Sequence, residues 1–88
     1  MSVVVIGCGY WGKNLIRNFS EIGELSGVCD DDRLLASKFS EKYKVPSLSY
    51  DEVLSSSSKA VVIAVPAKHH AKLSMDAFEA NKHVYVEK

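Results

Sequence analysis

The sequence predicts an α/β fold, a doubly wound parallel sheet of about five strands with helices on both faces. Continuous apolar runs at residues 3–6 and 60–65 are typical of strands buried on both faces of a parallel sheet. Amphipathic segments alternate with these runs, and a glycine-rich turn follows the first of them. Such alternation requires right-handed crossovers that place helices on both faces.

The first half of the chain supplies two strands and two helices. Residues 3–6 form the first strand, and the helix after the glycines has apolar residues at helical spacing until Gly23 stops it. Residues 25–30 are the second predicted strand, which ends in an acidic triplet. Residues 33–43 are the second predicted helix.

The second half continues the alternation. Residues 45–48 can form only a short or edge strand, because Pro46 has no N–H to donate. Ser49 and Glu52 have the spacing of a capping box, which predicts a brief helix over 51–55. A strand at 60–65, a helix at 70–80 with Asn81 as its cap and a last strand at 83–87 complete the series. This order indicates a Rossmann-type sheet with strand order 3-2-1-4-5.

The last strand is expected to lie at an edge of the sheet. Val84, Tyr85 and Val86 include none of the prolines or inward charges that protect edge strands. We therefore expect the 88-residue chain to self-associate into a homo-oligomer through this strand, by edge pairing or by exchange between chains.

Composition argues against several function classes. Eleven basic and eleven acidic residues balance, which gives no electrostatic footprint for nucleic acid or for an anionic membrane. The longest apolar run has eight residues, well short of the ~20 of a membrane span, and no secretory signal is present. The sequence therefore predicts a cytoplasmic protein.

Metal and disulfide chemistry are not expected either. Cys8 and Cys29 lack metal-binding spacing and are predicted to be small buried hydrophobes. His69 and His70 are adjacent, so they do not share a helix face and predict no metal site.

Gly7, Gly9 and Gly12 form a complete G-x-G-x-x-G between a buried strand and an amphipathic helix, the context of a dinucleotide-binding turn. Gly7 permits the tight turn, Gly9 lets a pyrophosphate approach the backbone, and Gly12 lets the helix pack closely. The helix start offers N–H groups and a partial positive charge. Tyr10 and Trp11 are either packing residues or further cofactor contacts.

Asp30 lies 18 residues after Gly12 at the end of the second strand, where a carboxylate can accept both hydroxyls of an adenosine ribose. It would repel a 2′-phosphate, which favours NAD over NADP. Arg33 could instead bind that phosphate, so NADP stays open. Asp31 and Asp32 are expected in solvent, with one of them capping the second helix.

Residues in the second half of the chain are expected at the carboxyl ends of the strands, where the glycine turn and Asp30 also lie. Pro66 closes the strand at 60–65 at its carboxyl end, where open α/β sheets bind ligands. His70, at the start of the next helix, is a candidate for the wall of the cleft.

Together these motifs resemble the N-terminal domain of the Gfo/Idh/MocA family, the relatives of glucose–fructose oxidoreductase and inositol dehydrogenase. The resemblance covers the whole chain: the glycine turn, the strand end at Asp30, Pro66 followed four places later by His70, and the stretch 82–88, which resembles the family's strand into Glu-Lys-Pro. Ala67 departs from the family, which usually has Asn there, and the sequence ends at Lys88, before the proline.

The resemblance implies a dehydrogenase. Lys88 would match the family's active-site lysine, which binds the substrate hydroxyl beside the nicotinamide, and Glu87 the residue near the nicotinamide ribose. The implied reaction is hydride transfer between nicotinamide C4 and an alcohol carbon of a sugar, a cyclitol or other polyol, or a nucleotide sugar. We expect residues 1–88 to be the dinucleotide-binding domain of a longer NAD(P)-dependent enzyme, inactive without a substrate domain.

Two other functions stay open. A non-catalytic nucleotide-sensing module would use the same glycine turn and Asp30 but would not need Lys88. A methyltransferase that binds S-adenosylmethionine shares a glycine loop and an acidic strand end, but Pro66 and the Glu87–Lys88 pair do not fit it.

Overall fold

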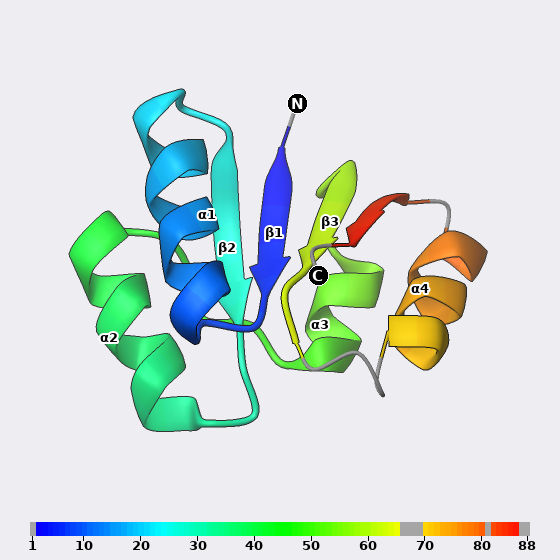
Figure 1. Cartoon of the computed structure of the whole chain (residues 1–88). Helices are drawn as coiled ribbons and strands as arrows, with labels where there is room; N and C mark the ends of the chain where they lie inside the picture. The colour runs from blue at the N-terminus through cyan, green and yellow to red at the C-terminus, as the bar shows by residue number, and fades with distance from the viewer. Residues whose placement is uncertain (1, 66–69, 81, 87–88) are drawn as a thin grey trace.

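The computed structural model describes residues 2–65, 70–80 and 82–86, and over these residues it confirms the doubly wound α/β architecture (Figure 1). Four strands form one parallel sheet in the order β2-β1-β3-β4. They are β1 (Val3–Ile6), β2 (Leu25–Cys29), β3 (Ala60–Ile63) and β4 (His83–Val86). The helices are α1 (Tyr10–Glu21), α2 (Arg33–Tyr43), α3 (Tyr50–Ser55) and α4 (His70–Glu79). None of these helices is long and apolar enough to cross a membrane.

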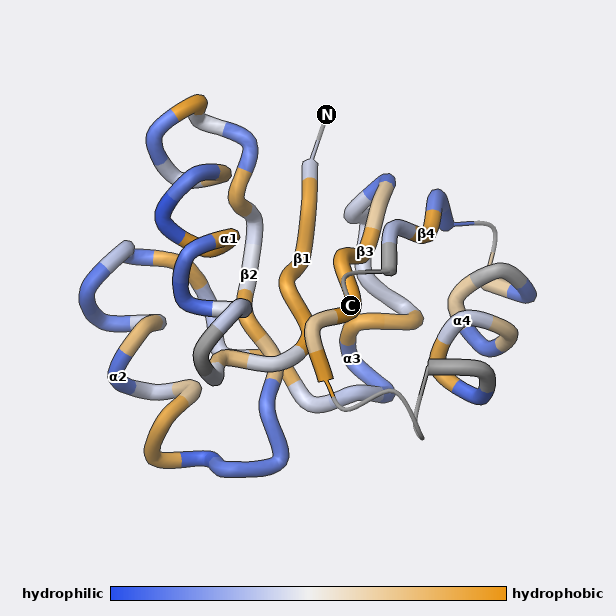
Figure 2. Tube along the Cα trace, in the orientation of Figure 1, coloured by the Kyte–Doolittle hydropathy of each residue, from blue (hydrophilic) through white to orange (hydrophobic). Residues whose placement is uncertain are grey.

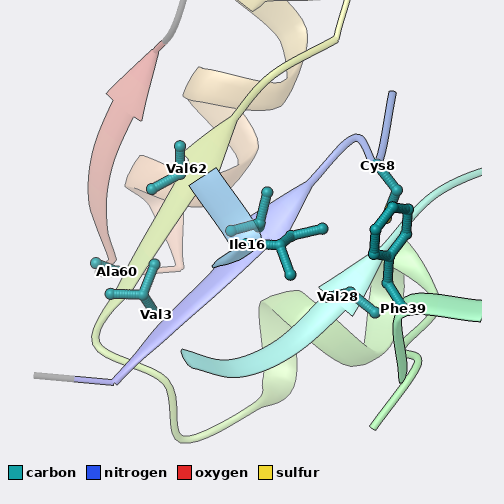
Figure 3. Packing of buried hydrophobic residues seen from close by; sticks show 8 residues of the cluster. Val3, Cys8, Ile16, Val28, Phe39, Ala60 and Val62 are labelled. Carbon is teal, nitrogen blue, oxygen red and sulfur yellow. The ribbon is translucent and has the colours of Figure 1, made fainter. Parts of the chain in front are cut away.

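The central strand β1 divides the core into two halves, because its side chains alternate between the two faces. Val3 and Val5 belong to a cluster that includes Ile16 of α1 and Phe39 of α2 (Figure 3). Val4 and Ile6 belong to a second cluster, which contains side chains of α3 and α4. Figure 2 shows β1 as an uninterrupted apolar segment. Helices cover both faces of β1, which explains its continuous apolar run.

The helix boundaries follow the local signals in the sequence. Asp32 caps α2 by accepting a hydrogen bond from the Leu35 N–H at 3.1 Å. Ser49 and Glu52 form the predicted capping box at the start of α3. Gly23 has a φ of +75° just after α1, the left-handed conformation that ends a helix. The predicted cap Asn81 lies outside the described residues.

The expected strand at 45–48 is wrong, so the described sheet has four strands rather than five. Only Ser47 pairs with β2, through a single parallel bridge to Val28. The Val28 N–H donates to the Pro46 carbonyl at 3.0 Å, and the Leu48 N–H donates to the Val28 carbonyl at 2.8 Å. Pro46 has no N–H with which to extend this pairing, so the bridge does not grow into a strand. The predicted order is otherwise kept, with the bridge beside β2.

Among the described residues, β4 lies at an edge of the sheet, as predicted, and pairs there only with β3. Tyr85 points to solvent and is 64% exposed. Self-association through this edge stays a prediction.

At the opposite end of the strands from the glycine turn, a buried lysine joins three segments. Lys82 precedes β4 and is only 6% exposed. Its ammonium donates hydrogen bonds to the carbonyl oxygens of Ser56 and Ser58, at 3.0 and 2.8 Å. Ser56 is the C-cap of α3, and Ser58 precedes β3. Burial, together with the charge of Lys59, lowers the pKa of Lys82. The lysine thus holds the end of α3 against the starts of two strands.

Replacing this lysine is expected to destabilise the fold. Lys82→Met keeps much of the side-chain volume but leaves two carbonyls without their donor, which should lower the free energy of unfolding by about 1–3 kcal/mol. Lys59→Met, at an exposed neighbouring lysine, is the control and should change the free energy of unfolding little. Urea denaturation followed by circular dichroism measures both. Equal stability of the two variants would contradict the role assigned to Lys82.

Candidate functional site

A cavity of about 520 Å³ opens at the carboxyl ends of the strands. Its volume lies in the range of small-molecule and cofactor sites. The described residues that line it come from the ends of β1, β2 and β3 and from the first turns of α3 and α4: Ile6, Gly7, Gly9, Cys29, Asp30, Asp31, Tyr50, Ala64, Val65, Lys72 and Leu73. The topology thus brings the glycine turn and the acidic end of β2 to one place.

The structure accounts differently for the presence of glycine at the three positions of the turn. Gly7 has a φ of +102°, and a Cβ there would lie 2.6 Å from the Ala64 carbonyl oxygen. A Cβ on Gly12 would collide with the Gly7 carbonyl, so α1 can lie this close only without a side chain at that position. Gly9 is exposed, and a Cβ there would meet no atom within 4 Å. The protein's own packing therefore explains Gly7 and Gly12 but not Gly9.

The carboxylate of Asp30 joins the end of β2 to the glycine turn. One oxygen accepts the Cys8 N–H at 2.7 Å, and the other accepts the Asp32 N–H at 2.8 Å. Both donors are backbone groups, so the carboxylate is held at the cavity in one orientation. Each oxygen has more than one lone pair and can accept a further hydrogen bond from a ligand hydroxyl.

The start of α1 is suited to an anion. Gly9 is its N-cap and has no side chain that could accept from the first-turn N–H groups, and no acidic residue lies in that turn. The partial positive charge of the helix end is therefore not offset by a carboxylate of its own first turn.

The other predicted site residues are less closely grouped. Trp11 lies in the first turn of α1 and is 55% exposed, so it is not a core residue. Arg33 begins α2 and is exposed. Neither of them is among the described residues that line the cavity. Tyr10 begins α1 and His70 begins α4, but their side chains lie outside the described residues, as do Pro66, Glu87 and Lys88 entirely.

The two cysteines are buried free thiols, as predicted. Burial, reinforced by the Asp30 carboxylate, raises the pKa of Cys8 to about 12. Burial and the neighbouring carboxylates of Asp31 and Asp30 raise the pKa of Cys29 to about 11. Both thiols stay protonated at neutral pH, so neither is a ready nucleophile. Within the described part of the chain, no group of three or more His, Cys, Asp or Glu side chains is arranged to hold a metal ion.

Sequence reasoning missed one wall of the cavity. Tyr50, Lys72 and Leu73 line it, although they belong to no recognised motif. A signal was available, since the turns that follow strand ends at the carboxyl edge of a parallel sheet face the ligand cleft. Tyr50 comes just after the capping serine, and the other two lie in the first turn of α4.

The model of the Gfo/Idh/MocA family, an oxidoreductase family with an NAD-binding Rossmann fold, matches residues 1–88. The chain belongs to this family. A search of curated proteins gives no match.

Solved structures agree with the assignment. The chain is 28% identical to UDP-N-acetylglucosamine 3-dehydrogenase GnnA from Acidithiobacillus ferrooxidans, with a TM-score of 0.93. It is 31% identical to an NAD-binding protein from Listeria innocua, with a TM-score of 0.87. GenD2 from gentamicin A biosynthesis, solved in complex with NAD, is 24% identical with a TM-score of 0.93 and so shows the fold. These alignments cover 100%, 99% and 100% of this chain but only 28%, 27% and 26% of the three structures.

The contrast between two glycines gives a test of the turn. Gly9→Val should leave the fold intact, because its side chain enters open space, yet should abolish NAD binding, because the side chain occupies the room of the pyrophosphate. Gly12→Val should instead lower the thermal midpoint, since its side chain meets the Gly7 carbonyl. Thermal denaturation and calorimetric titration with NAD separate the two effects. Retained NAD binding by Gly9→Val would contradict the assignment of the phosphate loop.

Proposed function

We propose that this chain binds NAD in the cavity at the strand ends and is the cofactor-binding domain of a dehydrogenase that acts on an alcohol carbon of a sugar, cyclitol or nucleotide sugar. The observation that carries the proposal is the Asp30 carboxylate, which faces the cavity while the N–H of Cys8 in the glycine turn holds it in place. Family membership supports the redox chemistry. GnnA, whose name includes a nucleotide sugar, supports the substrate class.

The residues of the cavity fit a dinucleotide. Gly9 leaves open space beside the start of α1, where backbone N–H groups suit a pyrophosphate. Asp30 has remaining lone pairs for two ribose hydroxyls. When bound, NAD supplies a hydride acceptor at C4 of the nicotinamide.

The chain's own residues then have separate tasks. The amides of the glycine turn hold the pyrophosphate, and Asp30 orients the adenosine ribose. From the family resemblance, we assign Lys88 to the substrate hydroxyl, where its amine can hold or move the hydroxyl proton. Glu87 is assigned to the nicotinamide ribose on the same ground.

Charge at the ribose end supports NAD over NADP. Asp30 and Asp31 both line the cavity, so a 2′-phosphate would enter beside two carboxylates. Of the described residues that line the cavity, Lys72 is the cation, and it donates to Asp76 at 2.8 Å. Arg33 is exposed at the start of α2 and is not among these lining residues.

Calorimetry with both cofactors tests this preference. NAD should bind at least about tenfold tighter than NADP, a difference of about 1.4 kcal/mol. Asp30→Ala should weaken the binding of NAD by about 1–3 kcal/mol, because hydrogen bonds to a charged acceptor are lost. Asp32→Ala is the matched control on the same triplet, since Asp32 caps α2 and does not line the cavity. Equal affinity for the two cofactors would show that Arg33 binds the 2′-phosphate.

Lys88 is tested by turnover in the intact enzyme. Lys88→Met should lower turnover by about a hundredfold or more, the size of a lost proton-transfer group. The affinity for NAD should change little, because the lysine is assigned to substrate and not to the dinucleotide. Unchanged turnover would remove Lys88 from the reaction. NAD binding without turnover of any alcohol by the unmodified enzyme would favour the nucleotide-sensing alternative.

A further inference from the structure

Two side chains of a polar cluster of three line the same cavity as Asp30. The Tyr50 hydroxyl of α3 donates to Asp76 Oδ2 of α4 at 3.0 Å. Lys72 Nζ donates to the same oxygen at 2.8 Å and lies over the Tyr50 ring, 5.8 Å from its centre. Tyr50 and Lys72 line the cavity together with Leu73. Two helices distant in sequence thus build this wall jointly.

The Tyr50 ring is fixed at both ends. The capping box of Ser49 and Glu52 sets the start of α3, and the ring packs against the core cluster of β1 and β3. Its hydroxyl is held by Asp76 and lies 3.5 Å from the Leu73 carbonyl. An aromatic ring held in this way keeps its position when a ligand arrives, so little ordering cost opposes a contact with it.

Asp76 positions both of its partners. One oxygen accepts from Tyr50 and Lys72 at once. The ammonium of Lys72, and then the Tyr50 hydroxyl, lower the pKa of Asp76, which stays ionised at neutral pH. Burial and the hydrogen bond to Asp76 raise the pKa of Tyr50, which keeps its proton and remains the donor. The pairing also offsets the charge of Lys72, so this wall is not a free cationic site for an extra phosphate.

The composition of the wall fits a purine. Asp30 takes the ribose in the proposed function, and the base attached to that ribose then meets solvent or other residues of the same cavity. The wall formed by Tyr50, Lys72 and Leu73 offers an aromatic ring, a hydrogen-bond donor above that ring and an aliphatic side chain. A purine has two apolar faces and ring nitrogens that accept hydrogen bonds at its edges. The wall therefore complements both features of adenine.

We propose that Tyr50 and Lys72 determine the specificity for the adenine base, with the Tyr50 ring packing against the base and the Lys72 ammonium donating to its edge. Asp76 is the residue that positions them. This inference rests on the proposed function, since it takes the ribose to lie on Asp30.

Calorimetric titration with ADP-ribose and with inorganic pyrophosphate tests the assignment, because only the first probe carries the base. Tyr50→Leu should lower the affinity for ADP-ribose about tenfold, the scale of a lost base–aromatic contact. Binding of pyrophosphate, which uses only the glycine turn, should change less than about twofold. Tyr50→Phe keeps the ring but loses the bond to Asp76, so its affinity for ADP-ribose should fall only about threefold.

Two further variants complete the experiment. Tyr43→Leu is the matched control, because Tyr43 stacks on Phe39 at 6.4 Å and packs on the other core cluster. It should bind ADP-ribose as the unmodified chain does. Lys72→Met changes a side chain that is 79% exposed, so it tests the wall even where a Tyr50 variant fails to fold. Lys72→Met should lower the affinity for ADP-ribose about threefold.

The outcomes separate the two proposals. Unchanged ADP-ribose affinity in folded Tyr50→Leu, or in Lys72→Met where Tyr50→Leu does not fold, overturns the adenine assignment and leaves the proposed function intact. An equal loss of affinity for ADP-ribose and for pyrophosphate also overturns the adenine assignment, because it indicates a general structural role of the substituted residue. Absence of ADP-ribose binding by the unmodified chain overturns the proposed function, and the adenine assignment with it.

Discussion

The hydrogen bond from the Cys8 N–H to Asp30 is the contact on which the site depends. Three of the six residues of the glycine turn have no side chain, and one of them, Gly7, adopts a backbone conformation that other residues avoid. Its shape is therefore set by neighbours: the end of β3 beneath Gly7, the backbone of β2 through the Gly7 N–H at 2.7 Å, and the Asp30 carboxylate. One carboxylate thus helps to shape the glycine turn, and in the proposed function it would also bind the ligand.

The two ends of the sheet are closed by different means. At the amino ends of the strands, Lys82 lies between the end of α3 and the first residues of β3 and β4. Its ammonium donates hydrogen bonds to backbone carbonyls there. At the carboxyl ends, glycines and an uncapped helix start leave a cavity. Backbone polar groups that are satisfied inside the protein at one end stay available at the other. This asymmetry supports the proposal that a ligand binds at the carboxyl edge.

Prediction from the sequence succeeded where a signal is local. The strand at residues 3–6, a cap of α2 at Asp31 or Asp32 and the box at Ser49 each depend on neighbours a few residues away, and all are confirmed, with Asp32 as the cap. The strand at 45–48 failed because a local β pattern does not show how far Pro46 lets pairing extend. Contacts such as Tyr50 with Asp76 and Lys82 with Ser56 join residues 26 positions apart. Such pairs leave no periodicity, so only the fold reveals them.

A phosphate loop made of backbone groups cannot by itself choose a cofactor. Its N–H groups recognise a pyrophosphate, which all dinucleotides and many nucleotides share. Discrimination must come from side chains that reach the parts where these ligands differ, the ribose and the base. In the proposed function, Asp30 and Asp31 would oppose a phosphorylated ribose by charge, while Tyr50, held by Asp76, would contact the base. Both groups are positioned by contacts made before any ligand binds, so little ordering cost opposes binding. In the proposed function, the contacts that hold Tyr50 on α3 and Lys72 on α4 would therefore help the site to distinguish ligands.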